Sequence, residues 1–112
     1  MYGGDYLGDL DAEWLQPNRT RLQLLATGGM LRVGELELAA GEPSRAVHWA
    51  TRAAAQFPGN ERAGRLLAAC HVAIGARSTA ATLLRDLVSA LRADGVEPEP
   101  ETLHALHRLT AR

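Results

Sequence analysis

Two glycines, Gly41 and Gly75, lie 34 residues apart, and each follows a run of residues with helical apolar spacing. Glycine often ends a helix, because it adopts the left-handed backbone conformation that a helix end requires. Ala46 and Ala80 are separated by the same interval. An interval of this length accommodates two helices and their turns. The spacing therefore predicts a chain built from repeated helical hairpins.

The composition favours an all-α fold. Hydrophobic residues make up 46% of the 112 residues but aromatic residues only 4%, so the core must be built from Leu, Ala and Val. Ala and Leu are strong helix formers, and few segments show the alternation typical of strands. At this length we expect one domain, residues 1–112, with a single core of modest size.

The positions of Gly and Pro divide the chain into four parts. Residues 1–12 are rich in Gly and Asp and are expected to form a loop. Residues 13–58 and 60–93 are each expected to form a hairpin of two helices. Residues 95–110 are expected to form a proline-rich corner and a last helix that caps the stack.

Turn residues predict where the helices of the hairpins begin and end. The first helix carries apolar or small residues three or four positions apart, namely Leu22, Leu25, Gly29, Val33, Leu36 and Ala40. The second helix is expected over about residues 43–56, because proline suits the first helical position. The third is expected from the cap Asn60 to about residue 74, and the fourth over about residues 77–93.

A period of 34 residues with two helices per unit is the spacing of tetratricopeptide repeats. Small residues at the motif positions would let paired helices approach closely, and Pro58 would end the first hairpin. The matching positions are Gly34, Gly41, Ala46, Ala50, Ala53 and Pro58 in the first unit, and Gly75 and Ala80 in the second. The sequence thus predicts tetratricopeptide-like antiparallel helix hairpins, stacked as an α-α superhelix with a C-terminal capping helix.

No combination of residues in the sequence indicates catalysis, so we do not expect an enzyme. Cys70 lies in an apolar helical stretch and is interpreted as a small buried hydrophobic residue. Glu101, His104 and His107 share one helical face, but a closed metal site needs four ligands. Neither a metal nor another cofactor is therefore expected.

The formal net charge is −1, yet residues 17–93 carry ten arginines against five acidic residues. The arginines are scattered at helical spacing, which favours a solvated surface over a nucleic-acid footprint. We therefore expect no direct contact between this segment and nucleic acid. Neither a signal peptide nor an apolar run of membrane-spanning length is found, so a cytoplasmic location away from membranes is expected.

The segments on either side of the repeats resemble one known family. YGGDYLGDLDAEWLQPNRTRLQLL is similar to the stretch that enters the repeats of the bacterial transcriptional activator domain. The matching residues are Gly4, Asp5, Leu7, Trp14, Pro17, Arg19 and Leu22. GVEPEPET followed by LHALHRL is similar to the closing signature of the same family, with Gly95, Pro98 and Pro100 at the corner before a last helix.

This resemblance implies the tetratricopeptide-like helical half of the SARP-type regulators that control antibiotic gene clusters in actinobacteria. In such regulators the domain follows a winged-helix DNA-binding domain, helps dimerisation and contributes to engaging RNA polymerase. The expected partners are therefore the winged-helix domain, RNA polymerase or a second copy in a homodimer. Because the winged helix and the first helices of the family would precede the Gly-Gly-Asp segment, we expect the chain to be the C-terminal part of a longer protein.

The repeat register predicts a concave face that holds Leu31 and Glu35 of the first helix and Arg62 and Arg65 of the third. Solenoid proteins use this face to bind extended or helical partners. The arginine pair would suit an acidic segment, either of a partner or of the protein's own terminus. The alternative is a solvated face without a binding role.

Two functions remain open from the sequence. The chain is either a non-enzymatic regulatory module of a bacterial transcription activator, or a tetratricopeptide-like adaptor in a membrane or signalling protein without a promoter role. A winged helix with a basic recognition helix upstream would favour the activator. A membrane span in that place would favour the adaptor.

Overall fold

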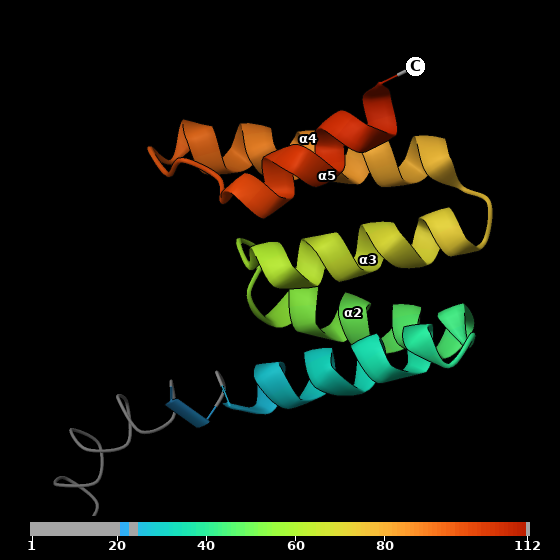
Figure 1. Cartoon of the computed structure of the whole chain (residues 1–112). Coiled ribbons are helices and arrows are strands. Elements are labelled where there is room, and N and C mark those ends of the chain that lie inside the picture. Colours follow the sequence, from blue (N-terminus) through green and yellow to red (C-terminus); the bar gives the residue numbers. More distant parts are fainter. Residues whose placement is uncertain (1–20, 23–24, 112) are drawn as a thin grey trace, which may run out of the picture.

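The computed structural model describes residues 21–22 and 25–111, which are helical with short connections and without any strand. A first helix covers residues 25–39, and residues 21–22 are helical as well. It is followed by α2 (Pro43–Gln56), α3 (Glu61–Ala73), α4 (Arg77–Ala93) and α5 (Pro100–Thr110), which Figure 1 shows as a stack. The predicted all-α fold is confirmed. The loop expected over residues 1–12 and the start of the first helix lie outside the described residues.

The helices begin at the residues that the sequence indicated. Pro43 and Pro100 stand in the first turns of α2 and α5. Backbone N–H groups there have no partner within the helix, so the N–H that proline lacks costs no helical hydrogen bond. Asn60 caps α3, because its side-chain Oδ1 accepts a hydrogen bond from the backbone N–H of Ala63 at 2.9 Å. These short-range signals act within one helical turn, which is why they can be recognised in the sequence.

Three helices end in the same way, at Gly41, Gly75 and Gly95. The φ angles of these glycines are 81°, 87° and 78°, in the left-handed region that side chains disfavour. The residue after each glycine donates its N–H to the carbonyl five residues earlier, with distances of 2.8 Å for Glu42, 2.7 Å for Ala76 and 2.8 Å for Val96. This hydrogen-bond pattern is the Schellman motif, and it satisfies helix-end carbonyls while the chain turns.

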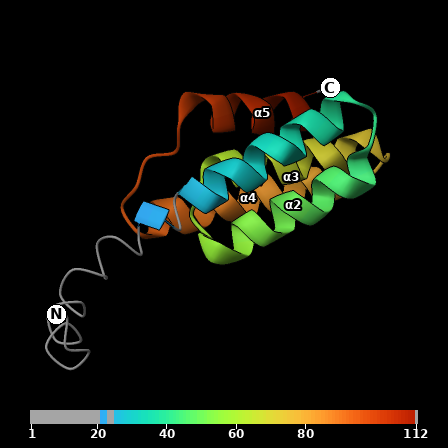
Figure 2. The same ribbon diagram turned by 90° about the horizontal axis from the view of Figure 1, so that it is seen from below.

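The helices pack side by side in chain order. Contacts join α2 to α3, α3 to α4 and α4 to α5, and α3 also contacts α5. Figure 2, the view from below, shows the first helix and α2 lying side by side, with α3 and α4 behind them. This arrangement is the expected stack of helical hairpins, with α5 folded back on α3 and α4.

The first core lies between the first helix, α2 and α3, and small residues dominate it. Its buried members are Leu31, Ala46, Ala50, Ala53, Ala63, Leu66 and Cys70. The three alanines of α2 are fully buried and lie on one face of the helix, because they are four and three positions apart. Such short side chains allow the helix axes to approach closely, as the repeat motif predicted.

The second core lies between α3, α4 and α5. Ala68, Ala80 and Leu84 form its buried centre. Leu87 of α4 and three residues of α5, Ala105, Leu106 and Leu109, pack against this centre and are themselves partly buried. The last helix therefore covers the apolar side that α3 and α4 present at this end of the stack.

The apolar spacing that predicted the first helix lies on the outer face of that helix. Leu25 is 64% exposed and Leu36 53% exposed, and Leu22 and Val33 are exposed as well. The inner face presents Leu31, Gly34 and the fully buried Thr27, whose Oγ1 donates a hydrogen bond to Oε1 of Gln56 at 3.1 Å. Periodicity thus identified the helix but not the side that it buries.

Gly34 marks the closest approach of the first helix to its neighbours. A Cβ atom at this position would lie 2.8 Å from Cδ2 of Leu66 and 3.3 Å from Cβ of Trp49. A valine would add two more carbons in the same space, where buried Leu66 has little room to move. Glycine is therefore required here by packing, although glycine inside a helix costs about 1 kcal/mol relative to alanine.

We expect Gly34→Val to lower the free energy of unfolding by about 1–3 kcal/mol, because it overpacks the first core. Gly28→Val is the matched control, since a Cβ on Gly28 would meet nothing within 4 Å. The control should change stability by less than about 0.5 kcal/mol, as helix propensities of the two residue types differ little. Urea denaturation followed by circular dichroism measures both values, and equal effects at the two positions would contradict the packing argument.

Candidate functional site

One face of the stack carries polar side chains that join the first helix to α3. Nε of Arg62 donates to Oε2 of Glu35 at 2.8 Å, and Nη2 of Arg62 donates to Oε1 at 2.7 Å. Two parallel hydrogen bonds of this kind fix both the distance and the orientation of the partners. The hydrogen bonds from Arg62 hold the pKa of Glu35 below its ordinary value, against the opposing effect of partial burial.

Farther along the same face, α3 binds the corner that precedes α5. Nη1 of Arg65 donates to Oε1 of Glu99 at 2.7 Å and to Oγ1 of Thr102 at 2.8 Å. The backbone N–H of Glu99 donates to Oε1 of Glu61 at 2.7 Å. Thr102 is fully buried, and Pro98, the residue before Glu99, is buried as well. Arg65 therefore binds an acidic residue of the chain's own C-terminal corner, one of the two alternatives left open by the sequence.

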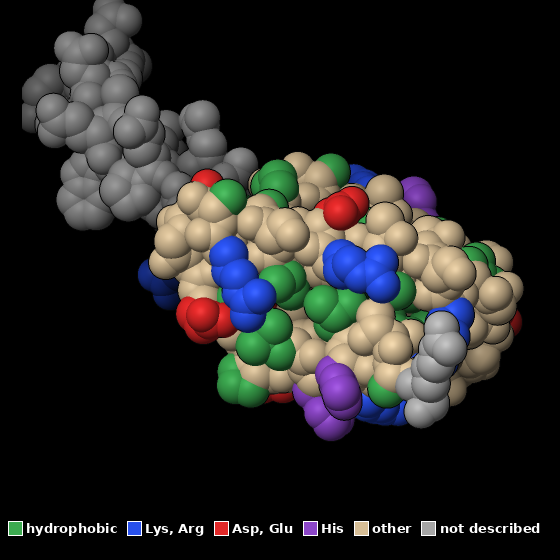
Figure 3. Space-filling view, turned by 90° about the horizontal axis from the view of Figure 1, so that it is seen from above, with side chains coloured by type: hydrophobic (Ala, Val, Ile, Leu, Met, Phe, Trp, Pro, Cys, Tyr) green, Lys and Arg blue, Asp and Glu red, His purple; other side chains and the backbone are tan. Residues whose placement is uncertain are grey.

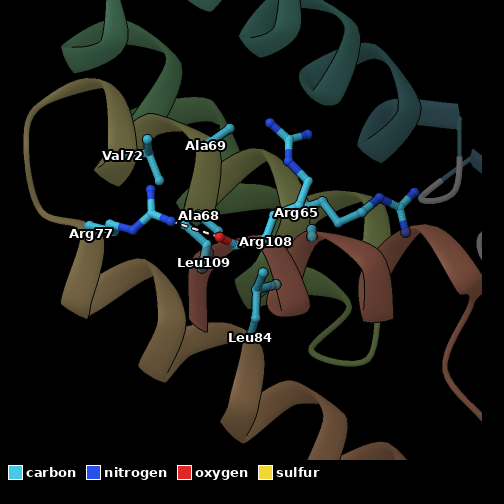
Figure 4. A pocket seen from close by; sticks show the side chains of 9 residues that line it. Arg65, Ala68, Ala69, Val72, Arg77, Leu84, Arg108 and Leu109 are labelled. Carbon is cyan, nitrogen blue, oxygen red and sulfur yellow. Dashed lines mark hydrogen bonds between the residues drawn. The ribbon is translucent and has the colours of Figure 1, made fainter. Parts of the chain in front are cut away.

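Next to Arg65 a groove of about 280 Å³ opens between α3, α4 and α5, and we call it the arginine groove. Figure 4 shows its lining, with the apolar side chains between the arginines. The lining consists of Arg65, Ala68, Ala69, Val72, Arg77, Leu84, Ala105, Arg108 and Leu109. It combines three cations with an apolar surface, and none of the described residues that line it is acidic.

The three arginines of the groove differ in their partners. Arg65 is paired with Glu99, as described above. Nη2 of Arg77 donates to the carbonyl oxygen of Arg108 at 2.7 Å, in the last turn of α5, where helix carbonyls lack partners within the helix. Within the described residues, the guanidinium of Arg108 has no hydrogen bond or ion pair. Arg108 is thus the cation of the groove that is available to bind an anion.

Arginines also lie on the end of the stack formed by α4 and α5. Figure 3, the view from above, shows their side chains next to exposed hydrophobic ones. Another hollow on this side is bordered by Arg77 and Arg85. The positive charge of the groove therefore continues onto the neighbouring surface.

The structure brings together three of the four residues predicted for the concave face. Glu35, Arg62 and Arg65 lie on one face, but each has a partner within the chain. Leu31 is only 2% exposed and belongs to the first core, so it is not part of the surface. Arg77 and Arg108 were not singled out from the sequence, because the repeat register does not extend to α5, whose packing against α3 and α4 brings the two residues to one groove.

The remaining candidate residues from the sequence lie either in the first core or exposed on α5. Cys70 is fully buried, and burial raises the pKa of its thiol, so the residue stays neutral in the first core. Glu101, His104 and His107 are exposed on α5. Among the described residues, no group of three His, Cys, Asp or Glu side chains could hold a metal ion. None of the described helices combines the length and apolar character that crossing a membrane would need.

The fold and this face define an all-α protein of stacked helical hairpins with a basic groove at one end. The family model of the bacterial transcriptional activator domain matches residues 1–109. The chain belongs to this family, and its role is related to bacterial transcriptional activation. A search of curated proteins and a search of solved structures found no significant match.

The Glu35–Arg62 pair predicts a pH dependence of stability. Because the folded state lowers the pKa of Glu35 from 4.5, the stabilisation is complete above that value and is lost as the pH falls through the lowered pKa. Both side chains are partly exposed, so we expect a contribution of about 0.5 kcal/mol at pH 7. Glu35→Gln should therefore destabilise the protein at pH 7, and the difference should shrink as the pH falls below 4.5.

Urea denaturation of wild type and variant at several pH values measures this difference. Glu42→Gln is the control, because Glu42 is exposed and forms no ion pair with any described residue. A difference between Glu35→Gln and wild type that stayed constant from pH 7 into the acid range would show that the carboxylate charge is not responsible.

Proposed function

We propose that this chain is a non-enzymatic protein-interaction module of a bacterial transcription activator, and that it acts through the face formed by the first helix, α3 and α5. One observation carries this proposal. On that face, ion pairs fix three helices to one another, and the arginine groove opens beside them. A preformed face of this kind lowers the ordering cost of binding a partner.

The proposal assigns the binding surface to Glu35, Arg62, Arg65 and the adjoining groove. The two ion pairs are partly exposed, so a partner can reach their outer edges. Polar groups of this kind give specificity and fast association more than raw affinity. The partners that we propose are the winged-helix DNA-binding domain of the same regulator and RNA polymerase, while DNA itself is bound by the winged helix.

The resemblance of both flanks to SARP-type regulators supports a cytoplasmic regulator of actinobacteria. All twelve basic residues are arginine, a composition typical of a GC-rich genome. The formal net charge of −1 also favours protein contacts over nonspecific binding to DNA. The proposal therefore separates the roles: this module contacts proteins, and another domain reads the promoter.

A fusion of the whole chain to an unrelated DNA-binding domain tests the proposal in bacterial cells. We expect transcription from a promoter with the matching operator to rise above the level given by the DNA-binding domain alone. The double variant Glu35→Arg with Arg62→Glu should reduce this activation, because it keeps the ion pair but exchanges the charges that a partner meets. Reporter activity measures the effect, and denaturation of the purified chain checks its stability.

The matched control exchanges the pair Glu37 and Arg45, whose carboxylate and guanidinium lie 3.7 Å apart between the first helix and α2. This exchange should leave activation unchanged, because it lies outside the proposed face. A fusion no more active than the DNA-binding domain alone would contradict a direct contact with the transcription machinery. Tight, sequence-selective binding of the purified chain to duplex DNA would contradict the separation of roles.

A further inference from the structure

The arginine groove has a chemistry that selects its ligand. Its floor consists of the aliphatic side chains of α3, α4 and α5, and its rim of guanidinium groups. We propose that the groove binds an acidic segment of a partner protein, with a carboxylate held by the guanidinium of Arg108 and a neighbouring apolar side chain on the floor. This inference rests on the proposed interaction role and names the chemistry of the partner.

The charges of the groove favour a carboxylate. Arg108 has no partner for its guanidinium among the described residues, and Arg77 uses Nη2 for the carbonyl of Arg108 while its other nitrogens have no described hydrogen bond. Arg77 and Arg108 line one groove, and no acidic residue is found among the described residues of its lining. An anion there would gain charge-assisted hydrogen bonds, which are about twice as strong as neutral ones.

The apolar floor favours a protein segment over a bare anion or a nucleic-acid backbone. Ala68, Ala69, Val72 and Leu109 line the groove, and Val72 is an exposed hydrophobic residue. An aliphatic or aromatic side chain would remove this surface from water, which a phosphate group cannot do. The combination suits a segment in which acidic and apolar residues are neighbours.

The chain itself already shows the binding mode at the edge of the groove. Glu99 of the corner accepts a hydrogen bond of 2.7 Å from Arg65, although the side chain of Glu99 is 53% exposed. A carboxylate of an incoming segment would compete with Glu99 for this arginine. Glu99 therefore limits the affinity of the groove, and Arg77 and Arg108 supply the cations that no carboxylate of the described residues binds.

A synthetic peptide that does not occur in the chain, SEYLDELEALW, is a suitable probe, because it has four acidic residues, no basic residue and several apolar ones. Labelled peptide is titrated with the whole chain and followed by fluorescence anisotropy. We expect saturable binding that weakens as salt is raised. The matched peptide SQYLNQLQALW, which lacks the charges, should bind at least about tenfold more weakly, a loss of 1.4 kcal/mol.

Two variants change the affinity in opposite directions. Arg108→Glu should weaken binding by about tenfold or more, since it replaces attraction by repulsion. Glu99→Gln should strengthen binding, because the amide oxygen still accepts a hydrogen bond but no longer competes as a charge. Arg52→Glu, on exposed α2 surface away from the groove, is the control and should leave the affinity unchanged.

The proposal is overturned if the uncharged peptide binds as well as the acidic one, or if Arg108→Glu binds with wild-type affinity. It is also overturned if duplex DNA displaces the peptide at equal phosphate and carboxylate concentrations, because the groove would then recognise charge alone. Circular dichroism of each variant confirms that it is folded. Loss of peptide binding with normal reporter activation would reject the groove and leave the interaction role in place.

Discussion

The packing of α3 between two sets of helices is the constraint on which the rest of the structure depends. Ala63, Leu66 and Cys70 face the first core, and Ala68 belongs to the second. A helix buried from two sides must carry small or compact side chains on both, because neighbouring helices approach it from opposite directions. This requirement explains the shortage of aromatic residues in the two cores.

Polar residues on the exposed side of α3 bind the elements that pack on either side of this helix. Glu61, Arg62 and Arg65 lie within one turn of one another, and between them they bind the first helix and the corner before α5. Each contact is a modest stabilising interaction at a partly exposed position. Together they set the position of α5, and the arginine groove exists because α5 lies against α3 and α4 at that position.

Much of the fold could be predicted because its signals are local. Gly41 and Gly75 end helices, and Asn60 and Pro43 begin them, through interactions that span a few residues. The close approach at Gly34 was also predicted, since the interval of 34 residues placed it opposite the alanines of α2. The inner face of the first helix was not, because Leu25 and Leu36 have the same spacing as a buried stripe and yet are exposed.

The candidate site, like the fold, could be predicted only in part from the sequence. Repeat spacing predicted that Glu35, Arg62 and Arg65 share a concave face, and in the structure Arg62 binds Glu35 while Arg65, one turn farther along α3, binds Glu99. Repeat spacing did not show that Glu99 pairs with Arg65, or that Arg77 binds the backbone carbonyl of Arg108 beside a groove.

By itself, the sequence determined the helices, their turns and the hairpin order, because backbone hydrogen bonds and glycine or proline conformations act over short distances. Only the tertiary structure decided which arginines form ion pairs and which arginine can still bind an anion. Those contacts join separate helices, and the relative position of these helices depends on the packing of both cores.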